Sequence, residues 1–313
     1  MSTDSESRNN YGPYLPGIGS FDPETKQPIR YNNVEDLRKV LEVHGKNTAA
    51  FLVEPIQGEA GIVVPDDSYL REVKALCEEH NVLLICDEIQ TGIARTGKLL
   101  CHEWSGIKPD LVLLGKAISG GMYPVSCVLG SKDVMLTIEP GTHGSTYGGN
   151  PLGSAVAIRA LELIQEENMV ERAESLGKIF RDGLQNINNP MIKVIRGKGL
   201  LNAIVIDESK TNGHGAWDLC MLFKEKGLLV GIALKIAHLW DVSRQNTDMG
   251  GQAKPTHQNI IRLAPPLVIT EQEIQNALDI IREAMEELTT LKGTKEADIL
   301  TPGEKNVHIG VDN

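Results

Sequence analysis

Three ionisable residues follow short apolar runs directly or within two residues: Glu54, Asp87 and Lys116. A carboxylate at the end of a buried strand lies in a low dielectric and needs a cationic partner, such as a protonated pyridine nitrogen. A desolvated lysine has a lowered pKa, so its amine can form a Schiff base and later shuttle a proton. Two of these residues also have an ordinary structural explanation, Asp87 as the N-cap of a helix and Lys116 as a solvated strand end.

A glycine-rich segment at 143–151 reads His-Gly-Ser-Thr-Tyr-Gly-Gly-Asn-Pro. Ser145 and Thr146 offer hydroxyl groups, and the glycines leave backbone amides open just before a predicted helix, which is a common way to hold phosphate. Glycine pairs before helices are also frequent for purely structural reasons. The segment alone therefore leaves phosphate binding and a plain turn as alternatives.

The elements that would position these residues belong to an α/β domain. Apolar runs at 49–53, 82–86, 111–114 and 125–129 predict strands, and the amphipathic stretch 70–79 predicts a helix between two of them. The runs are continuous rather than alternating, which is typical of a mainly parallel sheet that helices cover on both faces. Because ligands bind at the carboxyl ends of such strands, we expect the three ionisable side chains to share one edge of the sheet.

The rest of the sequence predicts a second, smaller α+β domain. A long helical pattern at 152–165 and 170–187 bridges to strands at 193–206 and 259–268 and to helices at 216–226 and 271–288. We therefore predict a large domain over 1–155, a bridging helix with the small domain over 156–291, and a disordered tail over 292–313.

Composition excludes several classes of function. The net charge of −11 argues against a nucleic-acid partner, and no run approaches the roughly 20 apolar residues that a membrane span needs. The five cysteines have no metal-ligand spacing and indicate reduced thiols, so we expect no metal. The amino-terminal residues carry no secretory or transit pattern, which favours a cytoplasmic protein.

Taken together, the motifs resemble the class-III, fold-type I aminotransferases that depend on pyridoxal 5'-phosphate. The resemblance rests on Asp-Glu-Ile-Gln-Thr-Gly at 87–92, Gly-Lys-Ala at 115–117 and Gly-Ser-Thr-Tyr-Gly-Gly-Asn-Pro at 144–151. Further matches at 53–61, 95–97, 196–203 and 261–267 are similar to the ornithine aminotransferases within that class. The similarity covers about residues 2–288, apart from a stretch near 230–252 and a loop near 21–29.

The resemblance implies a role for each matching residue. Lys116 would be the Schiff-base lysine and proton shuttle, and Asp87 would pair with the pyridine nitrogen. Ile89 would pack on the coenzyme ring, and Gln90 would lie near the ring hydroxyl. Ser145 and Thr146 would reach the phosphate of a neighbouring subunit, which implies a homodimer or larger homo-oligomer. Arg262 would bind the carboxylate of 2-oxoglutarate, and Glu59 would pair with Arg262 while ornithine is bound.

The sequence departs from the family in two places. Family members carry a long segment before the position of Met1, which would hold the Gly-Ala turn at the phosphate, the ring stacked on the coenzyme, the ornithine-pocket tyrosines and a substrate arginine. We therefore expect poor solubility and little activity from this chain alone, and the family's missing segment leaves a mitochondrial signal open. The second departure is 23 additional residues, 230–252, which represent either a translated intron of 69 nucleotides or a genuine surface loop.

The function that this resemblance implies is transfer of the δ-amino group of L-ornithine to 2-oxoglutarate, giving glutamate 5-semialdehyde and L-glutamate. Such a reaction links arginine catabolism to proline biosynthesis. Two alternatives stay open: another class-III transaminase acting on acetylornithine or a similar ω-amine, and a non-catalytic fragment that serves as a dimerisation partner.

Overall fold

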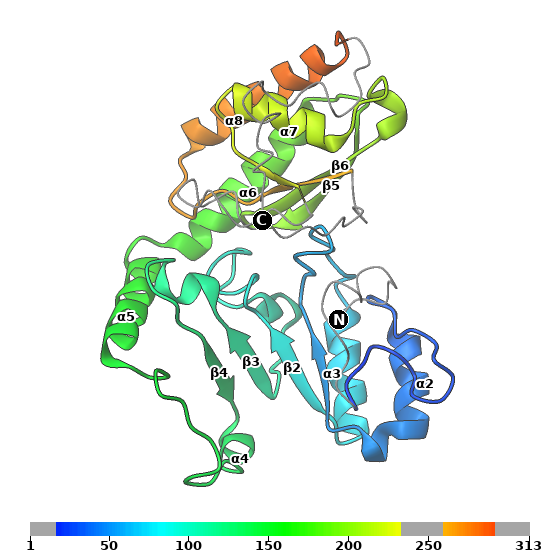
Figure 1. Cartoon of the computed structure of the whole chain (residues 1–313), viewed down its shortest axis with the longest axis vertical. Helices are drawn as coiled ribbons and strands as arrows, with labels where there is room; N and C mark the ends of the chain where they lie inside the picture. Colours follow the sequence, from blue (N-terminus) through cyan, green and yellow to red (C-terminus); the bar gives the residue numbers. More distant parts are fainter. Residues whose placement is uncertain (1–16, 233–258, 292–313) are drawn as a thin grey trace, which may run out of the picture.

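Two four-stranded sheets organise the part of the chain that the structure, a computed structural model, describes: residues 17–232 and 259–291. The first sheet has the order β1 (Ala50–Val53), β2 (Leu83–Asp87), β3 (Leu111–Leu114) and β4 (Cys127–Gly130). The second has the order β5 (Ile192–Lys198), β6 (Leu201–Ile206), β8 (Ile260–Leu263) and β7 (Gly231–Ile232). Figure 1 shows the two sheets in separate halves of the molecule, each with its own helices.

The first sheet is mainly parallel, which confirms the α/β prediction. β1, β2 and β3 run parallel, while β4 pairs antiparallel with β3. Helices α2 (Val34–His44) and α3 (Tyr69–Glu79) cover one face of this sheet. Their apolar stripes pack with alternate residues of β2, because side chains on a strand alternate between the two faces. The buried contacts include Leu41, Val73, Leu84 and Cys86.

The other face of this sheet is less covered than the continuous apolar runs predict. The intervening residues of β2 and β3 are only half-buried, and Leu52 on β1 is 53% exposed. The expectation of helices over both faces is therefore wrong for the residues that the structure describes. A strand that is apolar on both sides gives the same sequence pattern whether or not a neighbouring segment covers its second face.

The second sheet is antiparallel throughout, and three helices complete an α+β unit, as predicted. α6 (Met169–Asn186), α7 (Ala216–Glu225) and α8 (Glu271–Leu288) pack their apolar stripes into one core with β6 and β8. The predicted strand at 193–206 is two strands joined by a turn at Gly199, where φ is +53°. The strand predicted at 259–268 ends at Leu263, before the Pro265-Pro266 pair that cannot donate to the ladder.

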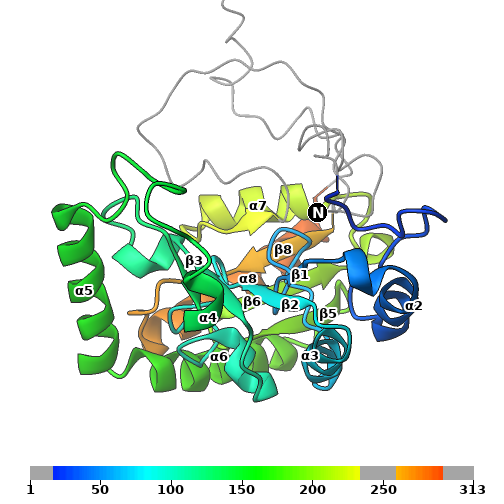
Figure 2. The ribbon, with the colours of Figure 1, turned by 90° about the horizontal axis from the view of Figure 1, so that it is seen from below.

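Helix α5 (Pro151–Glu166) connects the first sheet to α6. Asn150 caps α5 by accepting from the Gly153 amide at 2.8 Å. In both views α5 and α2 lie on opposite sides of the first sheet (Figures 1 and 2). The domain boundary expected at 155 falls inside α5, and it stays a proposal. Residues 233–252 of the additional segment and the tail 292–313 lie outside the described residues.

Five short helical segments connect the larger elements: η1 (Gly45–Asn47), η2 (Cys101–Ser105), η3 (Lys116–Ser119), α4 (Lys132–Met135) and η4 (Glu208–Lys210). η3 begins at the lysine that the sequence analysis singled out. Within ranges 17–232 and 259–291, no helix is both long and apolar enough to cross a membrane.

Helix α6 touches the turn between β5 and β6 at Gly177, in the middle of the helix. A Cβ atom added to Gly177 would lie 1.9 Å from the carbonyl oxygen of Gly199 and 2.2 Å from its carbonyl carbon. Both neighbours are backbone atoms of the β5–β6 turn. This turn itself packs against the backbone of Thr96, so these atoms have little freedom to move. Only glycine lets the helix approach the turn this closely.

We expect Gly177→Ala to lower the free energy of unfolding by about 2 kcal/mol, because overpacking outweighs the roughly 1 kcal/mol that alanine contributes in a helix interior. Urea denaturation followed by circular dichroism measures this change. Gly183→Ala on the same helix is the matched control, because its Cβ would meet the flexible end of the Leu278 side chain. Equal losses of unfolding free energy in the two variants would show that the Gly199 backbone moves to make room for the added Cβ atom.

Candidate active site

The carboxyl ends of β1, β2 and β3 bring the three ionisable residues to one edge of the first sheet. Glu54 directly follows β1, Asp87 is the last residue of β2, and Lys116 follows β3 after a single glycine, Gly115. The parallel register pairs Val53 with Cys86 and Asp87 with Leu113, so the three strands end at the same level. Parallel pairing therefore makes one cluster out of residues that lie about 30 positions apart in sequence.

Lys116 adopts a strained backbone conformation. Its φ is +43°, in the left-handed region that costs an L-residue about 1–2 kcal/mol. The preceding Gly115 is a neighbour of Ile89, because a Cβ atom on Gly115 would make ordinary van der Waals contact with the Ile89 side chain at 3.4 Å. Strain of this kind persists where the surrounding structure imposes it and is concentrated at functional sites.

The pKa of the Lys116 amine is lowered, mainly because the surrounding protein desolvates the ammonium group even though the side chain as a whole is exposed. Arg262 lowers the pKa further by charge repulsion, while the carboxylates of Glu59, Asp87 and Glu54 oppose the shift. The amine therefore lies among four charged groups that come from both sheets. A lowered pKa increases the fraction of neutral, nucleophilic amine.

Asp87 is half-buried at the end of its strand. Its Oδ1 atom accepts a hydrogen bond of 3.1 Å from the Ile89 amide, and the segment that follows is a loop rather than a helix. Within the described ranges, no Lys, Arg or His side chain comes within 4 Å of the Asp87 carboxylate. A partly desolvated carboxylate without a cation is a good partner for a positive charge that a ligand brings.

A three-residue cluster spans the two halves of the molecule beside Lys116. Arg262 on β8 donates from a terminal nitrogen to Oε1 of Glu59 at 2.8 Å, and Gln90 donates its amide to the same oxygen at 2.9 Å. Burial tends to raise the pKa of Glu59, but the hydrogen bonds and charge of Arg262, with Gln90 and Lys116, lower it overall. The carboxylate is therefore ionised at neutral pH, and the ion pair is complete.

Gly58 permits this cluster to form. A Cβ atom at Gly58 would lie 2.4 Å from the side-chain oxygen of Gln90, and the Gly58 amide donates to Glu54 at 2.9 Å. Burial raises the pKa of Glu54, and the Asp87 charge adds to that increase, although the Gly58 hydrogen bond opposes it. The glycine of the Glu-Pro-Ile-Gln-Gly sequence thus leaves room for the Gln90 amide.

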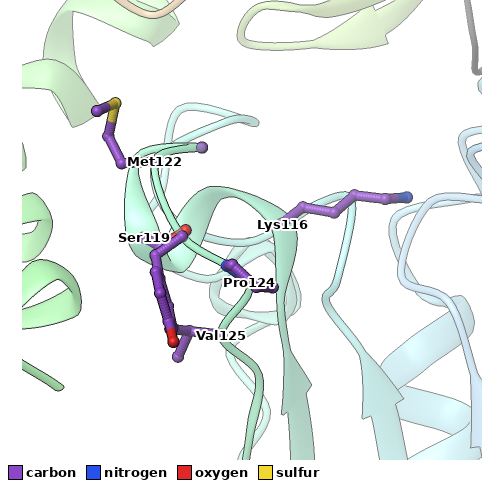
Figure 3. Close-up of a pocket in the computed structure, with 7 residues that line it drawn as sticks. Lys116, Ser119, Met122, Pro124 and Val125 are labelled. Atoms are coloured by element: carbon purple, nitrogen blue, oxygen red, sulfur yellow. The ribbon is translucent and has the colours of Figure 1, made fainter. Parts of the chain in front are cut away.

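A cavity of about 360 Å³ is lined by Lys116 and by the loop that follows η3. Ser119, Gly121, Met122, Tyr123, Pro124 and Val125 form the rest of its lining. In Figure 3 the Lys116 side chain extends to the opposite side from Ser119, Met122 and Val125. Sequence reasoning missed these residues, although the Gly120-Gly121 pair indicates a turn close to the lysine.

Ser145 and Thr146 are not part of this cluster. Both lie on the exposed loop between α4 and α5, where Ser145 accepts only a local hydrogen bond from the Gly148 amide at 2.9 Å. The neighbouring Tyr147 is 82% exposed. The structure thus brings together Glu59, Asp87, Ile89, Gln90, Lys116 and Arg262, and it places the two hydroxyl residues on the surface.

Glu88 is a second residue that the sequence analysis passed over. Its carboxylate is buried and accepts four hydrogen bonds: from the Thr91 hydroxyl, the Cys101 amide, and both the amide and the ring of His102. These bonds of 2.6 to 2.9 Å close the loop that carries Ile89 and Gln90. The sequence signal that could have identified Glu88 is a second carboxylate directly after Asp87, at the end of a strand.

Among the described residues, no group of three potential metal ligands gathers.

Comparison with known proteins defines the class. A model of the class-III aminotransferases matches residues 1–285, so this chain belongs to the class-III aminotransferase family. The chain is similar to the ornithine aminotransferase of Emericella nidulans, with 68% identity over the whole chain and 64% of that protein. It is also similar to the ornithine aminotransferase of Schizosaccharomyces pombe, with 54% identity over 95% of the chain and 63% of that protein.

Solved structures agree with the fold. The crystal structure of ornithine aminotransferase from Toxoplasma gondii is 41% identical and covers 92% of this chain and 61% of its own, with a TM-score of 0.76. A second structure of that enzyme, 40% identical with a TM-score of 0.76 over 93% of this chain and 61% of its own, is described with partial occupancy of the coenzyme at its active site. The chain thus spans less than two thirds of the length of these relatives.

Proposed function

We propose that this chain carries the coenzyme-binding and substrate-binding residues of an ornithine δ-aminotransferase. The reaction transfers the δ-amino group of L-ornithine to 2-oxoglutarate and yields glutamate 5-semialdehyde and L-glutamate. The observation that carries the proposal is the Arg262–Glu59 ion pair of 2.8 Å beside the lysine of strained backbone. The names of the relatives point to the same reaction.

The residues present fit pyridoxal 5'-phosphate as coenzyme. When bound, pyridoxal phosphate supplies an electron sink for the negative charge that develops at the substrate carbon. Asp87, which has no cationic partner within the described ranges, would hold a proton on the pyridine nitrogen. Ile89 would pack on the ring face, and Gln90 would lie near the ring hydroxyl. Lys116 would hold the coenzyme and move the proton at the substrate carbon.

The Arg262–Glu59 pair would let one pocket serve two unlike substrates in turn. With the pair closed, the arginine charge is neutralised, so a diamine such as ornithine meets no exposed cation. With the pair open, the Arg262 guanidinium can bind the second carboxylate of 2-oxoglutarate in the bidentate manner that arginine favours. The side chain of Glu59 is 52% exposed, so solvent is available to the carboxylate once it leaves the arginine.

We expect Arg262→Met to weaken 2-oxoglutarate binding to the coenzyme-loaded chain by roughly 100-fold, because a charge-assisted hydrogen-bonded pair is worth about 2–5 kcal/mol. Ornithine binding should change by only a few fold. Titration of the coenzyme absorbance with each substrate measures both values, and Arg159→Met on exposed helix α5 is the control. Equal losses for both substrates would contradict the assigned role, and tighter binding of N-acetylornithine than ornithine would favour the acetylornithine alternative.

A second copy of the chain is the partner that we propose. Ser145 and Thr146 lie on an exposed loop that also carries the exposed Tyr147, and large apolar side chains are exposed on the chain segments that precede and follow it. These are Met122, Val128, Leu129, Leu136, Ile138, Leu152 and Ile158. An apolar surface of this kind is typical of an interface, where the two hydroxyl groups could reach a neighbouring phosphate. We also propose a cytoplasmic location, the one expected in the sequence analysis.

A further inference from the structure

Arg95 joins the two halves of the molecule without a carboxylate partner. Arg95 lies on the loop between β2 and η2. Its NH1 nitrogen donates to the carbonyl oxygens of Leu200, at 3.2 Å, and of Pro265. The Leu200 amide donates back to the Arg95 carbonyl oxygen at 3.0 Å. Burial lowers the pKa of Arg95 to about 10, and within the described ranges no Asp or Glu forms an ion pair with it. Burying a cation that binds only carbonyl oxygens, without an opposite charge, costs free energy.

The two carbonyl groups lie at the end of one strand pair. β6 pairs with β8 so that Asn202 lies opposite Leu263 and Ala203 opposite Arg262. Continuing that register by two residues places Leu200 opposite Pro265. Proline has no amide to donate, so the ladder ends there. The guanidinium of Arg95 binds both open carbonyl groups and caps the strand pair, three residues beyond Arg262.

The loop that carries Arg95 is rigid at both ends. Glu88 closes its base with four hydrogen bonds, and Ile93 and Ala94 are buried with φ of +55° and +67°. Near its tip the turn at Gly199 lies so close that a Cβ atom there would be 2.4 Å from the Thr96 backbone. Gln90 lies on the same loop, five residues before Arg95. The position of the strand end therefore affects the position of the loop that carries Gln90.

We propose that Arg95 is a positioning residue for the substrate arginine. It fixes the end of the β6–β8 pair to the loop of Gln90, so that Arg262 and Gln90 meet at the same oxygen of Glu59. The assignment of Arg262 to substrate binding rests on the proposed function, whereas the mechanical link does not. Lysine is a poor substitute because both bonds come from NH1, at the end of the guanidinium group, and a lysine ammonium lies one bond nearer the backbone.

The test compares Arg95→Lys and Arg95→Met with Arg181→Met in the purified full chain. Arg181 is the matched control, because it also donates to backbone at this turn, to Gly199 at 2.8 Å, but lies wholly within the second half. Hydrogen exchange by mass spectrometry should show roughly 10-fold faster exchange at 199–206 and 260–268 in both Arg95 variants, which corresponds to about 1.4 kcal/mol. Helix α3 should exchange as in the wild type in every variant. Unchanged exchange at the two segments would overturn the link.

A second measurement separates positioning from general stability. In the coenzyme-loaded chain, Arg95→Lys should weaken 2-oxoglutarate binding about 10-fold and ornithine binding less than about 2-fold, because only the dicarboxylate needs Arg262 in place. Equal weakening for both substrates would overturn the positioning role. If the wild-type chain binds neither substrate, the proposed function fails, and the exchange result alone decides whether Arg95 holds the strand end.

Discussion

Replacing Lys116 with alanine should abolish site-specific covalent capture of pyridoxal phosphate by this chain. Desolvation at the edge of the first sheet lowers the pKa of the Lys116 amine, and its strained backbone holds it among the charges of Glu59, Asp87 and Arg262. Exposed lysines remain protonated at neutral pH and react weakly with aldehydes. Alanine removes the amine without changing the backbone conformation that the turn imposes.

The measurement is incubation with pyridoxal phosphate, reduction with borohydride and peptide mapping by mass spectrometry. The peptide that contains residue 116 should carry the label in the wild type and in Lys39→Ala, an exposed control on α2. Lys116→Gly also removes the amine but relieves the φ of +43°, so it should be more stable than Lys116→Ala by about 1 kcal/mol. Absence of label in both variants then excludes unfolding as the cause. A wild-type label spread evenly over surface lysines would refute the assignment.

Replacing Asp87 with asparagine should weaken coenzyme binding by about 2–5 kcal/mol, or roughly 30-fold to several thousand-fold, because a partly buried cation would lose its carboxylate. Asparagine has the same shape, and its oxygen can still accept the bond that the Ile89 amide donates at 3.1 Å. The local turn should therefore survive, and the loss should be electrostatic. Oxidised and reduced forms of the protein should bind the coenzyme with the same affinity, because the thiol of Cys86, next to Asp87, is buried.

Equilibrium titration of the coenzyme absorbance gives the dissociation constant for each variant. Asp182→Asn is the control, because this aspartate lies on the exposed face of helix α6 in a surface ion pair with Lys178. Surface pairs of this kind contribute about 0–1 kcal/mol, so the control should bind coenzyme as the wild type does. An Asp87→Asn variant that binds with unchanged affinity would show that the carboxylate does not face the ring.

The strands of the first sheet follow from local pattern alone. Apolar runs predicted β1, β2 and β3 within one or two residues, because a buried strand needs an unbroken apolar run of about its own length. Helix α8 was predicted at its observed bounds, and its capping box of Thr270 and Glu273 marks the start. Helix α2 was missed, because a three-turn amphipathic pattern next to an irregular segment is easily overlooked.

The sequence determined the strand ends and therefore the placing of Glu54, Asp87 and Lys116 at one edge, since parallel strands of one sheet end together. Local pattern does not show which groups from the second half join them: the resemblance alone led us to expect the Arg262–Glu59 pair, and only the tertiary structure revealed the contact of Arg95 with Pro265. Arg262 reaches Glu59 across 203 positions of sequence, and Arg95 reaches Pro265 across 170. Periodicity reports which face of a single element is apolar, whereas the meeting of the two halves depends on close backbone approach, such as that of Gly199 to Thr96. Such contacts leave no repeating pattern in the chain, because each depends on the position of a partner far away in sequence.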